Sequence, residues 1–166
     1  MLPSQLEQNS TLVAVEAACP GALVGGRLDR GEWTAEVPAE RVAEVAAVLK
    51  RECGFERLST VTAVDRYPAE PRFEIVYHLH SIARNERLRL KCRLPGENPE
   101  IDSLTSVWRS ANWYEREVFD LFGVGFRNHP DLRRIMMPED WQGHPLRKDY
   151  PVHGYRYSYC DEQEAR

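Results

Sequence analysis

The sequence predicts an α+β fold, a two-layer domain of helices packed on a mixed sheet, with an extended irregular C-terminal tail. Segments with helical hydrophobic periodicity and segments with strand-like alternation follow one another in separate blocks, an order typical of this class. The chain has 166 residues, 42% of them hydrophobic and 29% charged, which suits one domain with a buried core. We therefore expect a core domain over residues 1–123 and a recognition tail over residues 124–166.

A helix and a hairpin are predicted first. Ser4 and Glu7 fit a capping box, and apolar residues within 12–19 suit a helix that ends at a Pro-Gly pair. Residues 24–28 and 33–37 flank the sequence DRGE, which favours a short β-hairpin.

A second helix is expected to begin after Pro38. Apolar residues recur there at helical spacing, and charged residues take the opposite face. The apolar residues of this helix are Val42, Val45, Ala46, Leu49 and Cys53, and its charged residues are Glu40, Glu44 and Arg51.

Three strands are predicted next. Residues 58–68 are rich in β-branched side chains, and residues 72–81 and 87–94 alternate with period two around the turn sequence ARNE. The side chains expected to face the core are Leu88, Leu90, Cys92 and Leu94, and those expected to form a basic row on the other face are Arg87, Arg89, Lys91 and Arg93.

The last third is expected to hold short helices and then irregular backbone. Ser103 is a candidate cap for one short helix and Asn112 for a second. Beyond Gly123 the glycine and proline content argues against long regular elements.

Composition excludes several functional classes. The net charge of −4 argues against a general polyanion binder, and we expect no nucleic-acid partner. No apolar run approaches the roughly 20 residues of a membrane span, and the N-terminal residues do not resemble a signal peptide, which favours a cytoplasmic chain. The four cysteines form no C-x-x-C pair and no phosphate-binding glycine loop is present, so we expect no cofactor in this chain.

Two weaker patterns leave alternatives open. His78 and His80 project to one face of a strand, a spacing that ligates a metal when further ligands join, although exposed imidazoles are the favoured interpretation. The basic row with nearby Tyr77 suits a nucleic-acid backbone, although a solvated face or a protein contact is favoured.

Residues 112–123 carry the most informative pattern. On a helical wheel Trp113, Val118 and Leu121 share one half with Tyr114 and Phe122, and Glu117 falls among them. A buried carboxylate must be paired or protonated, so Glu117 is expected either to be an acid with a raised pKa or to bind a guanidinium. The arginines just downstream of this helix that we expect to supply it are Arg133 and Arg134.

The tail admits a catalytic and an interface interpretation. A metal-dependent hydrolase would recruit His129 and His144 with Asp131 and Asp149. Both histidines precede proline, where extended backbone serves recognition, and no nucleophile has its own base. Aromatic, arginine and methionine side chains alternate with prolines, which favours an interface.

The run EREVFDLFGVGFRNHPDLRRIM, followed by PEDWQGHPLRKDYP, closely resembles the signature region of one subunit family of the proton-pumping NADH-quinone oxidoreductases. This subunit is known as C in those enzymes and as the 30-kilodalton subunit in mitochondrial complex I. The resemblance is firm over residues 103–151 and diffuse before them. It marks the following partner-binding or signature positions, none of them catalytic: Glu115, Arg116, Glu117, Asp120, Phe126, His129, Pro130, Arg133, Arg134, Ile135, Trp141, His144, Leu146, Arg147, Asp149 and Tyr150.

The resemblance implies an accessory subunit of the peripheral arm, packed against the quinone-site subunit, which is the one known as D and helps to form the site of quinone reduction. The complex would carry FMN, iron-sulfur clusters and quinone in other subunits and would couple electron transfer from NADH with proton translocation. It would place this chain at the cytoplasmic side of the bacterial inner membrane, attached only through the complex. Related modules occur in membrane-bound hydrogenases, so an equivalent subunit of such a complex is the alternative.

Overall fold

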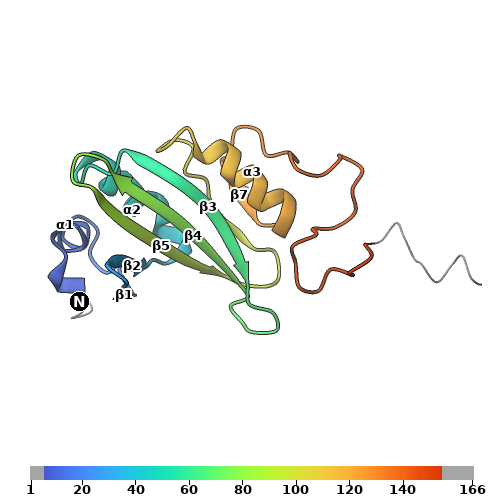
Figure 1. Cartoon of the computed structure of the whole chain (residues 1–166), viewed down its shortest axis with the longest axis horizontal. Helices are drawn as coiled ribbons and strands as arrows, with labels where there is room; N and C mark the ends of the chain where they lie inside the picture. Colours follow the sequence, from blue (N-terminus) through green and yellow to red (C-terminus); the bar gives the residue numbers. More distant parts are fainter. Residues whose placement is uncertain (1–5, 155–166) are drawn as a thin grey trace, which may run out of the picture.

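The computed structural model describes residues 6–154, which form a five-stranded mixed sheet with three α-helices (Figure 1). The strand order is β1-β2-β5-β4-β3; β2 runs parallel to β5, and the other neighbours are antiparallel. The strands are β1 (Gly25–Asp29), β2 (Glu32–Glu36), β3 (Arg57–Asp65), β4 (Phe73–Ser81) and β5 (Glu86–Leu94), and the helices are α1 (Ser10–Ala18), α2 (Val42–Arg51) and α3 (Ala111–Phe122). The predicted fold class is confirmed.

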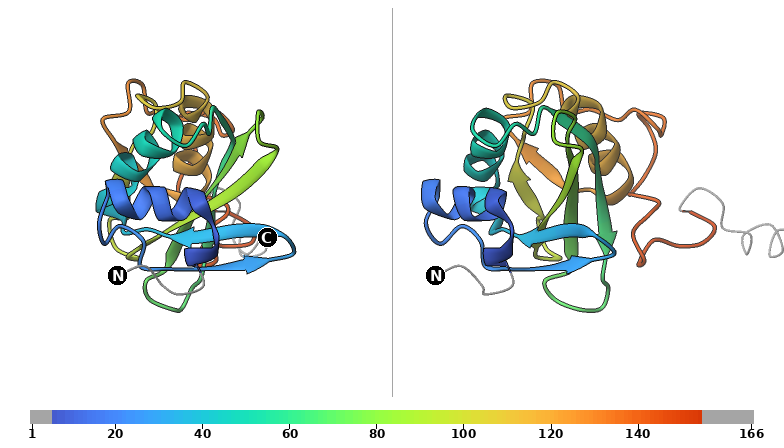
Figure 2. Two further views of the ribbon diagram at one scale, coloured as in Figure 1. Left: turned by 90° about the vertical axis from the view of Figure 1, so that its left-hand side faces the viewer. Right: turned by 60° about the vertical axis from the view of Figure 1, so that its left-hand side comes forward.

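The core lies between one face of this sheet and the helices. Period-two alternation in β4 and β5 puts Tyr77 opposite Leu90 and Ile75 opposite Cys92, and all four side chains are fully buried. Figure 2 shows α1 and α2 on one side of the sheet. The predicted apolar stripe of α2 is buried there, and the basic row of β5 lies on the opposite face.

The beginnings of the first two helices differ from the sequence prediction. Helix α1 begins at Ser10, because the Asn9 side chain accepts a hydrogen bond from the Leu12 N–H at 3.0 Å. A 3₁₀ turn, Leu6–Gln8, precedes it, and the predicted cap Ser4 lies outside the described residues. A second 3₁₀ turn, Ala39–Arg41, comes between Pro38 and α2.

The segment between β5 and α3 was predicted incorrectly in two places. Ser103 does not cap a helix, because the chain that follows forms turns. Its hydroxyl accepts the Thr105 N–H at 3.1 Å and donates to the Glu115 carboxylate at 2.6 Å. Helix α3 begins at Ala111 after the N-cap Ser110, so Asn112 lies inside the helix and does not cap it.

A second, two-stranded sheet connects the core with the tail. Strand β6 (Glu100–Asp102) pairs in parallel with β7 (Gly125–Arg127), which follows α3. Val124 and Phe126 are buried in the hydrophobic core, and the backbone beyond them runs without regular elements past α3 (Figure 1). The division between residues 123 and 124 stays a prediction. Within the described residues no helix combines the length and apolarity that a bilayer crossing needs.

Candidate functional site

Helix α3 positions the conspicuous charged residues by lying between the core and the tail. One face, with Ala111 and Val118, packs into the core, while Arg116 and Asp120 are covered by the tail. The helix ends where Gly123 adopts a left-handed conformation, φ 74°, and donates its N–H to the Phe119 carbonyl. Two buried faces on one helix explain why Glu115, Arg116 and Asp120 are buried as well as its apolar residues.

Asp120 fixes the turn at residues 134–137. Its carboxylate is fully buried; Oδ2 accepts the backbone N–H groups of Ile135, Met136 and Met137 at 3.0, 2.7 and 2.9 Å. Oδ1 accepts from the Arg134 guanidinium at 2.6 Å. Burial acts to raise the pKa of Asp120, but these donors outweigh it and lower that pKa below its ordinary value.

Two arginines attach the tail backbone to α3. Arg116 donates to the carbonyls of Arg133 and Arg134 at 3.1 and 3.4 Å, and its guanidinium lies 5.0 Å from the Trp113 ring centre. Arg134 in turn donates to the Gly143 carbonyl at 3.0 Å. The signature arginines therefore hold irregular backbone through carbonyl oxygens that no regular element satisfies.

The tail also caps the carboxyl end of α3. His144 Nδ1 contacts the Asp120 carbonyl at 2.9 Å, and the Leu146 N–H donates to the Leu121 carbonyl at 3.0 Å. A Cβ on Gly123 would lie 2.5 Å from the His144 ring, so glycine is required by both the conformation and the space.

A buried arginine secures the distal tail to the sheet. The Arg72 guanidinium makes two bonds to Asp65, at 2.8 and 2.7 Å, and two to Asp149, at 2.8 and 2.7 Å. Asp65 also accepts the Lys148 N–H at 2.8 Å. The Arg72 hydrogen bonds lower the pKa of Asp149 to about 2 and hold the pKa of Asp65 far below its usual range.

Neither Asp65 nor Arg72 belongs to the signature positions, so sequence reasoning missed this pair. A signal for it was present, because alternation along β3 places Asp65 in register with the buried Val61 and Ala63. A carboxylate at a core-facing strand position requires a partner.

Glu115 binds the loop that follows β6. Its fully buried carboxylate accepts from the Leu104 N–H at 2.7 Å and from the Ser103 hydroxyl at 2.6 Å. His129 Nε2 lies 4.0 Å away and contacts the Asn112 carbonyl at 3.2 Å, while its Nδ1 accepts an N–H from the tail. Such a ring is neutral with the proton on Nε2, in accord with a pKa lowered by burial.

The pH dependence of stability should report on Glu115. Burial raises its pKa from 4.5 to about 7, so between these values the folded chain holds a proton that the unfolded chain has lost. The contribution of Glu115 to the free energy of unfolding should therefore fall as pH rises from 4.5 to about 7. Urea unfolding at several pH values should show a shallower fall for Glu115→Gln, whereas Glu117→Gln should leave the profile unchanged. Parallel profiles for Glu115→Gln and the parent chain would contradict this assignment.

The expectation for Glu117 is wrong. Its side chain is exposed and has no hydrogen-bond or ion-pair partner among residues 6–154. Core and tail cover two faces of α3 and leave a third stripe to solvent, on which Glu117 lies with Trp113, itself 63% exposed. Arg134 binds Asp120 instead, and Arg133 forms an exposed pair with Asp131 at 3.0 Å.

The geometry also contradicts the hydrolase interpretation. His129 contacts the carbonyl of Asn112, and His144 contacts the carbonyl of Asp120. These two carbonyls are eight residues apart on α3, a separation of about 12 Å, so the two imidazoles bind at different places along the helix. In the part of the chain that the structure describes, no three histidine, cysteine or acidic side chains are arranged to hold a metal ion. His78 and His80 do share a face of β4, as expected, and Tyr77 is buried on the other face.

The remaining signature residues fall into buried and exposed groups. Phe126 is core, Tyr150 donates from its hydroxyl to the Gln142 carbonyl at 3.2 Å, and Arg147 bonds Asp149 at 3.3 Å. Ile135 and Trp141 are half-buried, and Pro130 is exposed.

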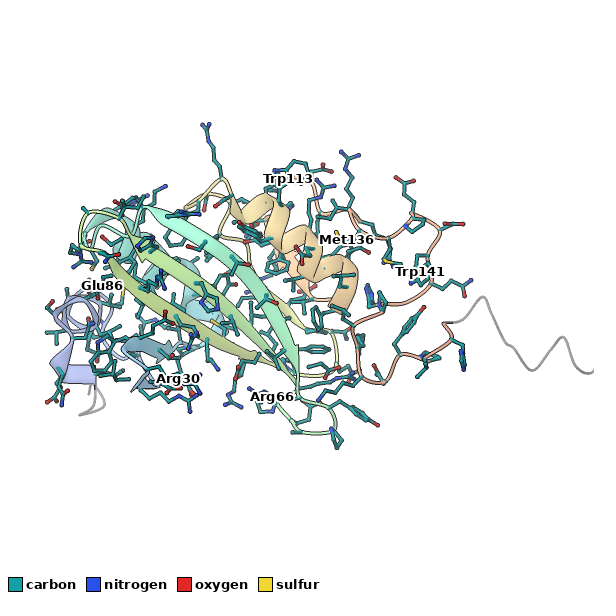
Figure 3. The ribbon with its side chains drawn as sticks, in the orientation of Figure 1. Arg30, Arg66, Glu86, Trp113, Met136 and Trp141 are labelled. Atoms are coloured by element: carbon teal, nitrogen blue, oxygen red, sulfur yellow. The ribbon has the colours of Figure 1, made fainter. Side chains whose placement is uncertain are left out.

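Large apolar side chains remain exposed around α3 and the tail. Met136 is 61% and Leu146 52% exposed, alongside Trp113. Figure 3 shows Trp113, Met136 and Trp141 at the end of the molecule that α3 and the tail form, far from Glu86. We call Trp113, Met136 and Leu146 the apolar set; its backbone is held by the buried bonds described above, so the surface is preformed.

Comparisons of the sequence agree on the relationship of this chain. The family model of the 30 Kd subunit of respiratory-chain NADH dehydrogenase matches residues 35–156. The chain is 47% identical over 149 residues to the NADH-quinone oxidoreductase subunit known as C from Geobacter sulfurreducens, covering 89% of this chain and 92% of the relative. It is 43% identical over 161 residues to the equivalent protein of Roseiflexus castenholzii, covering 96% and 92%.

Solved structures have the same fold. A trypsin-resistant fragment of Nqo5 superimposes with a TM-score of 0.64 at 32% identity, covering 77% of this chain and 99% of the fragment. A chain of the archaeal membrane-bound sulfane sulfur reductase has a TM-score of 0.77 at 24% identity, covering 96% of this chain and 92% of that one. The chain thus belongs to the 30-kDa subunit family of respiratory-chain NADH dehydrogenases, whose bacterial members include the C-type subunits of NADH-quinone oxidoreductase.

Proposed function

We propose that this chain is a non-catalytic, structural subunit of the peripheral arm of an NADH-quinone oxidoreductase. It docks on the quinone-site subunit, in a complex that couples electron transfer from NADH to quinone with proton translocation. FMN, iron-sulfur clusters and quinone belong to other subunits. The chain lies on the cytoplasmic side of the bacterial inner membrane, attached only through the complex, with no nucleic-acid partner.

The observation that carries this proposal is the exposed apolar set on a rigid support. Irregular backbone over 134–150 has few bonds of its own, yet Asp120, Arg116 and Arg72 hold it through charge-assisted hydrogen bonds. Holding Met136 and Leu146 at an exposed surface costs solvation, and Trp113, although its ring contacts the Arg116 guanidinium, is still 63% exposed. Preorganised aromatic and aliphatic anchors of this kind bind partners with little loss of conformational freedom.

Removal of two anchors should weaken assembly without unfolding the chain. In Trp113→Ala/Met136→Ala, both altered side chains are mostly exposed, so the unfolding midpoint should change little. Loss of two anchors of about 2 kcal/mol each should greatly reduce capture of the quinone-site subunit. Tagged chains would be purified from native membranes, and the co-purified proteins quantified by mass spectrometry.

The matched control is Ile82→Ala. Ile82 is 60% exposed but lies in the β4–β5 connection, away from α3, so its loss should leave capture of the quinone-site subunit unchanged. Undiminished capture by the double variant would refute docking through this surface, and failure of the parent chain to bring any peripheral-arm subunit would refute the proposed function.

A further inference from the structure

The sheet face opposite the helices contains two electrostatically different halves. Side chains of β2, β3, β4 and β5 line it, and the basic row of β5 runs its full length. In one half three cations lie within 4 Å of the same buried carboxylate. Glu74, 2% exposed, lies 2.7 Å from Lys91, 3.2 Å from Arg66 and 3.8 Å from Arg93. Each of these three cations therefore has an ion-pair partner within the chain.

The other half is a hollow of about 530 Å³ whose lining, among residues 6–154, contains three arginines and one carboxylate. Cross-strand pairing places Arg57, His80 and Arg87 in one row, and Thr60, His78 and Arg89 in the next. We call this site the basic hollow.

A single carboxylate faces these cations. Glu32 bonds Arg89 at 2.9 Å and reaches Arg87 at 3.5 Å, while Arg57 has no ion-pair partner within residues 6–154. The Nε2 atom of His80 is buried without a hydrogen-bond partner among the same residues. Burial, and after it the positive charge of Arg89, lower the pKa of His78. Arg57, which has no ion pair among these residues, and Arg87, whose pair with Glu32 is long, are therefore the guanidinium groups available to an outside anion.

The shape and the lining favour an acidic polypeptide. The hollow is open to solvent, whereas sites for small ligands bury most of the ligand. A single-stranded nucleic acid would stack its bases on aromatic side chains, and the described lining of the hollow contains no tryptophan, tyrosine or phenylalanine, with Tyr77 fully buried on the other face. Arginine forks match carboxylates two bonds at a time.

We propose that the basic hollow docks an acidic segment of a neighbouring subunit, with carboxylates bound to Arg57 and Arg87 and an acceptor at His80. This contact is separate from the apolar set around α3. The inference rests on the proposed function only for the statement that the partner is a subunit of the same complex.

Photo-cross-linking in the assembled complex tests the proposal. A photoreactive amino acid at Ser59, which lines the hollow, should cross-link to one segment rich in aspartate and glutamate, identified by mass spectrometry. Arg57→Ala/Arg87→Ala should lower the yield about tenfold, because two charge-assisted contacts are lost. Arg66→Ala/Arg93→Ala, on the same face but outside the hollow, in the half where both arginines already pair with Glu74, should leave the yield unchanged.

Four outcomes would overturn the inference: a cross-link to a neutral segment, a cross-link to nucleic acid, no cross-link, or equal loss in both double variants. A second arm uses the isolated chain, with the ring signals of His78 and His80 followed by NMR. A peptide of alternating Glu and Thr should shift these signals, and its Gln-Thr counterpart should not; tighter binding of inorganic pyrophosphate than of the acidic peptide would identify a small-anion site instead.

The two proposals fail separately. A chain that co-purifies with the quinone-site subunit but gives no cross-link refutes the basic hollow as a docking site and leaves the proposed function standing. A chain that brings no peripheral-arm subunit refutes the proposed function, and the peptide titration then decides whether the hollow binds acidic segments.

Discussion

Asp120→Ala is expected to destabilise the folded chain by about 3 to 5 kcal/mol, because it removes one partner of a buried ion pair. The carboxylate is fully buried and binds both Arg134 and three backbone N–H groups of the tail. Alanine would leave the guanidinium and all three donors without these bonds. Urea unfolding followed by the fluorescence of buried tryptophan, chiefly Trp108, measures the change.

Two variants calibrate this result. Asp120→Asn retains the shape and one acceptor oxygen but not the charge, so it should destabilise by less than alanine does. Asp131→Ala removes an acid of the same type from an exposed pair with Arg133 and should change stability by no more than about 0.5 kcal/mol. If Asp120→Ala matched Asp131→Ala, the tail would not depend on the Asp120 contacts.

Arg72→Ala should have an effect of similar size, about 3 to 5 kcal/mol, for the complementary reason. It would leave Asp65, only 4% exposed, without the cation that binds it twice, and it would release Asp149 and with it the distal tail. Arg72→Lys keeps the positive charge and should recover part of the loss. The recovery should be incomplete, because an ammonium group cannot make two parallel bonds to each of two carboxylates. Thermal and urea unfolding would measure both, and a stable Arg72→Ala chain would refute the pairing.

The Arg72 site also fixes the direction of an acid effect. The pKa values of Asp65 and Asp149 are held below their ordinary value of 3.8, so their contribution to stability is present above that pH and is lost as pH falls toward about 2. Arg72→Ala should therefore lose stability less steeply than the parent chain over this acidic range. This window lies below the one in which Glu115 titrates, so the two effects are separable.

Local patterns predicted the sheet and the second helix correctly, because each depends on which side chains alternate or recur along one segment. The hairpin of β4 and β5 follows from period two, and α2 from its apolar stripe. The cap of the first helix was harder to predict from the sequence: Asn9 caps α1, whereas the capping-box pattern indicated Ser4. The two short strands β6 and β7 have three residues each and carry too little periodicity to be recognised.

The wheel of α3 was misread because it assumes one buried face. The tail covers a second face, so the exposed stripe carries Trp113 and Glu117, and the buried acids are Glu115 and Asp120. The apolar half of the wheel placed Glu117 inside, and a wheel built on hydrophobicity alone contains no term for a carboxylate that backbone N–H groups of a distant segment will satisfy.

The sequence by itself determined the fold class, the family and the importance of the charged stretch before Gly123, since these depend on composition, periodicity and an ordered run of residue types. Only the tertiary structure decided which carboxylate meets which cation: Asp120 with Arg134, and Asp65 and Asp149 with Arg72. Such pairs join residues up to 77 positions apart, and their energies depend on burial and on distances of a few ångströms, which arise only when separate segments pack together.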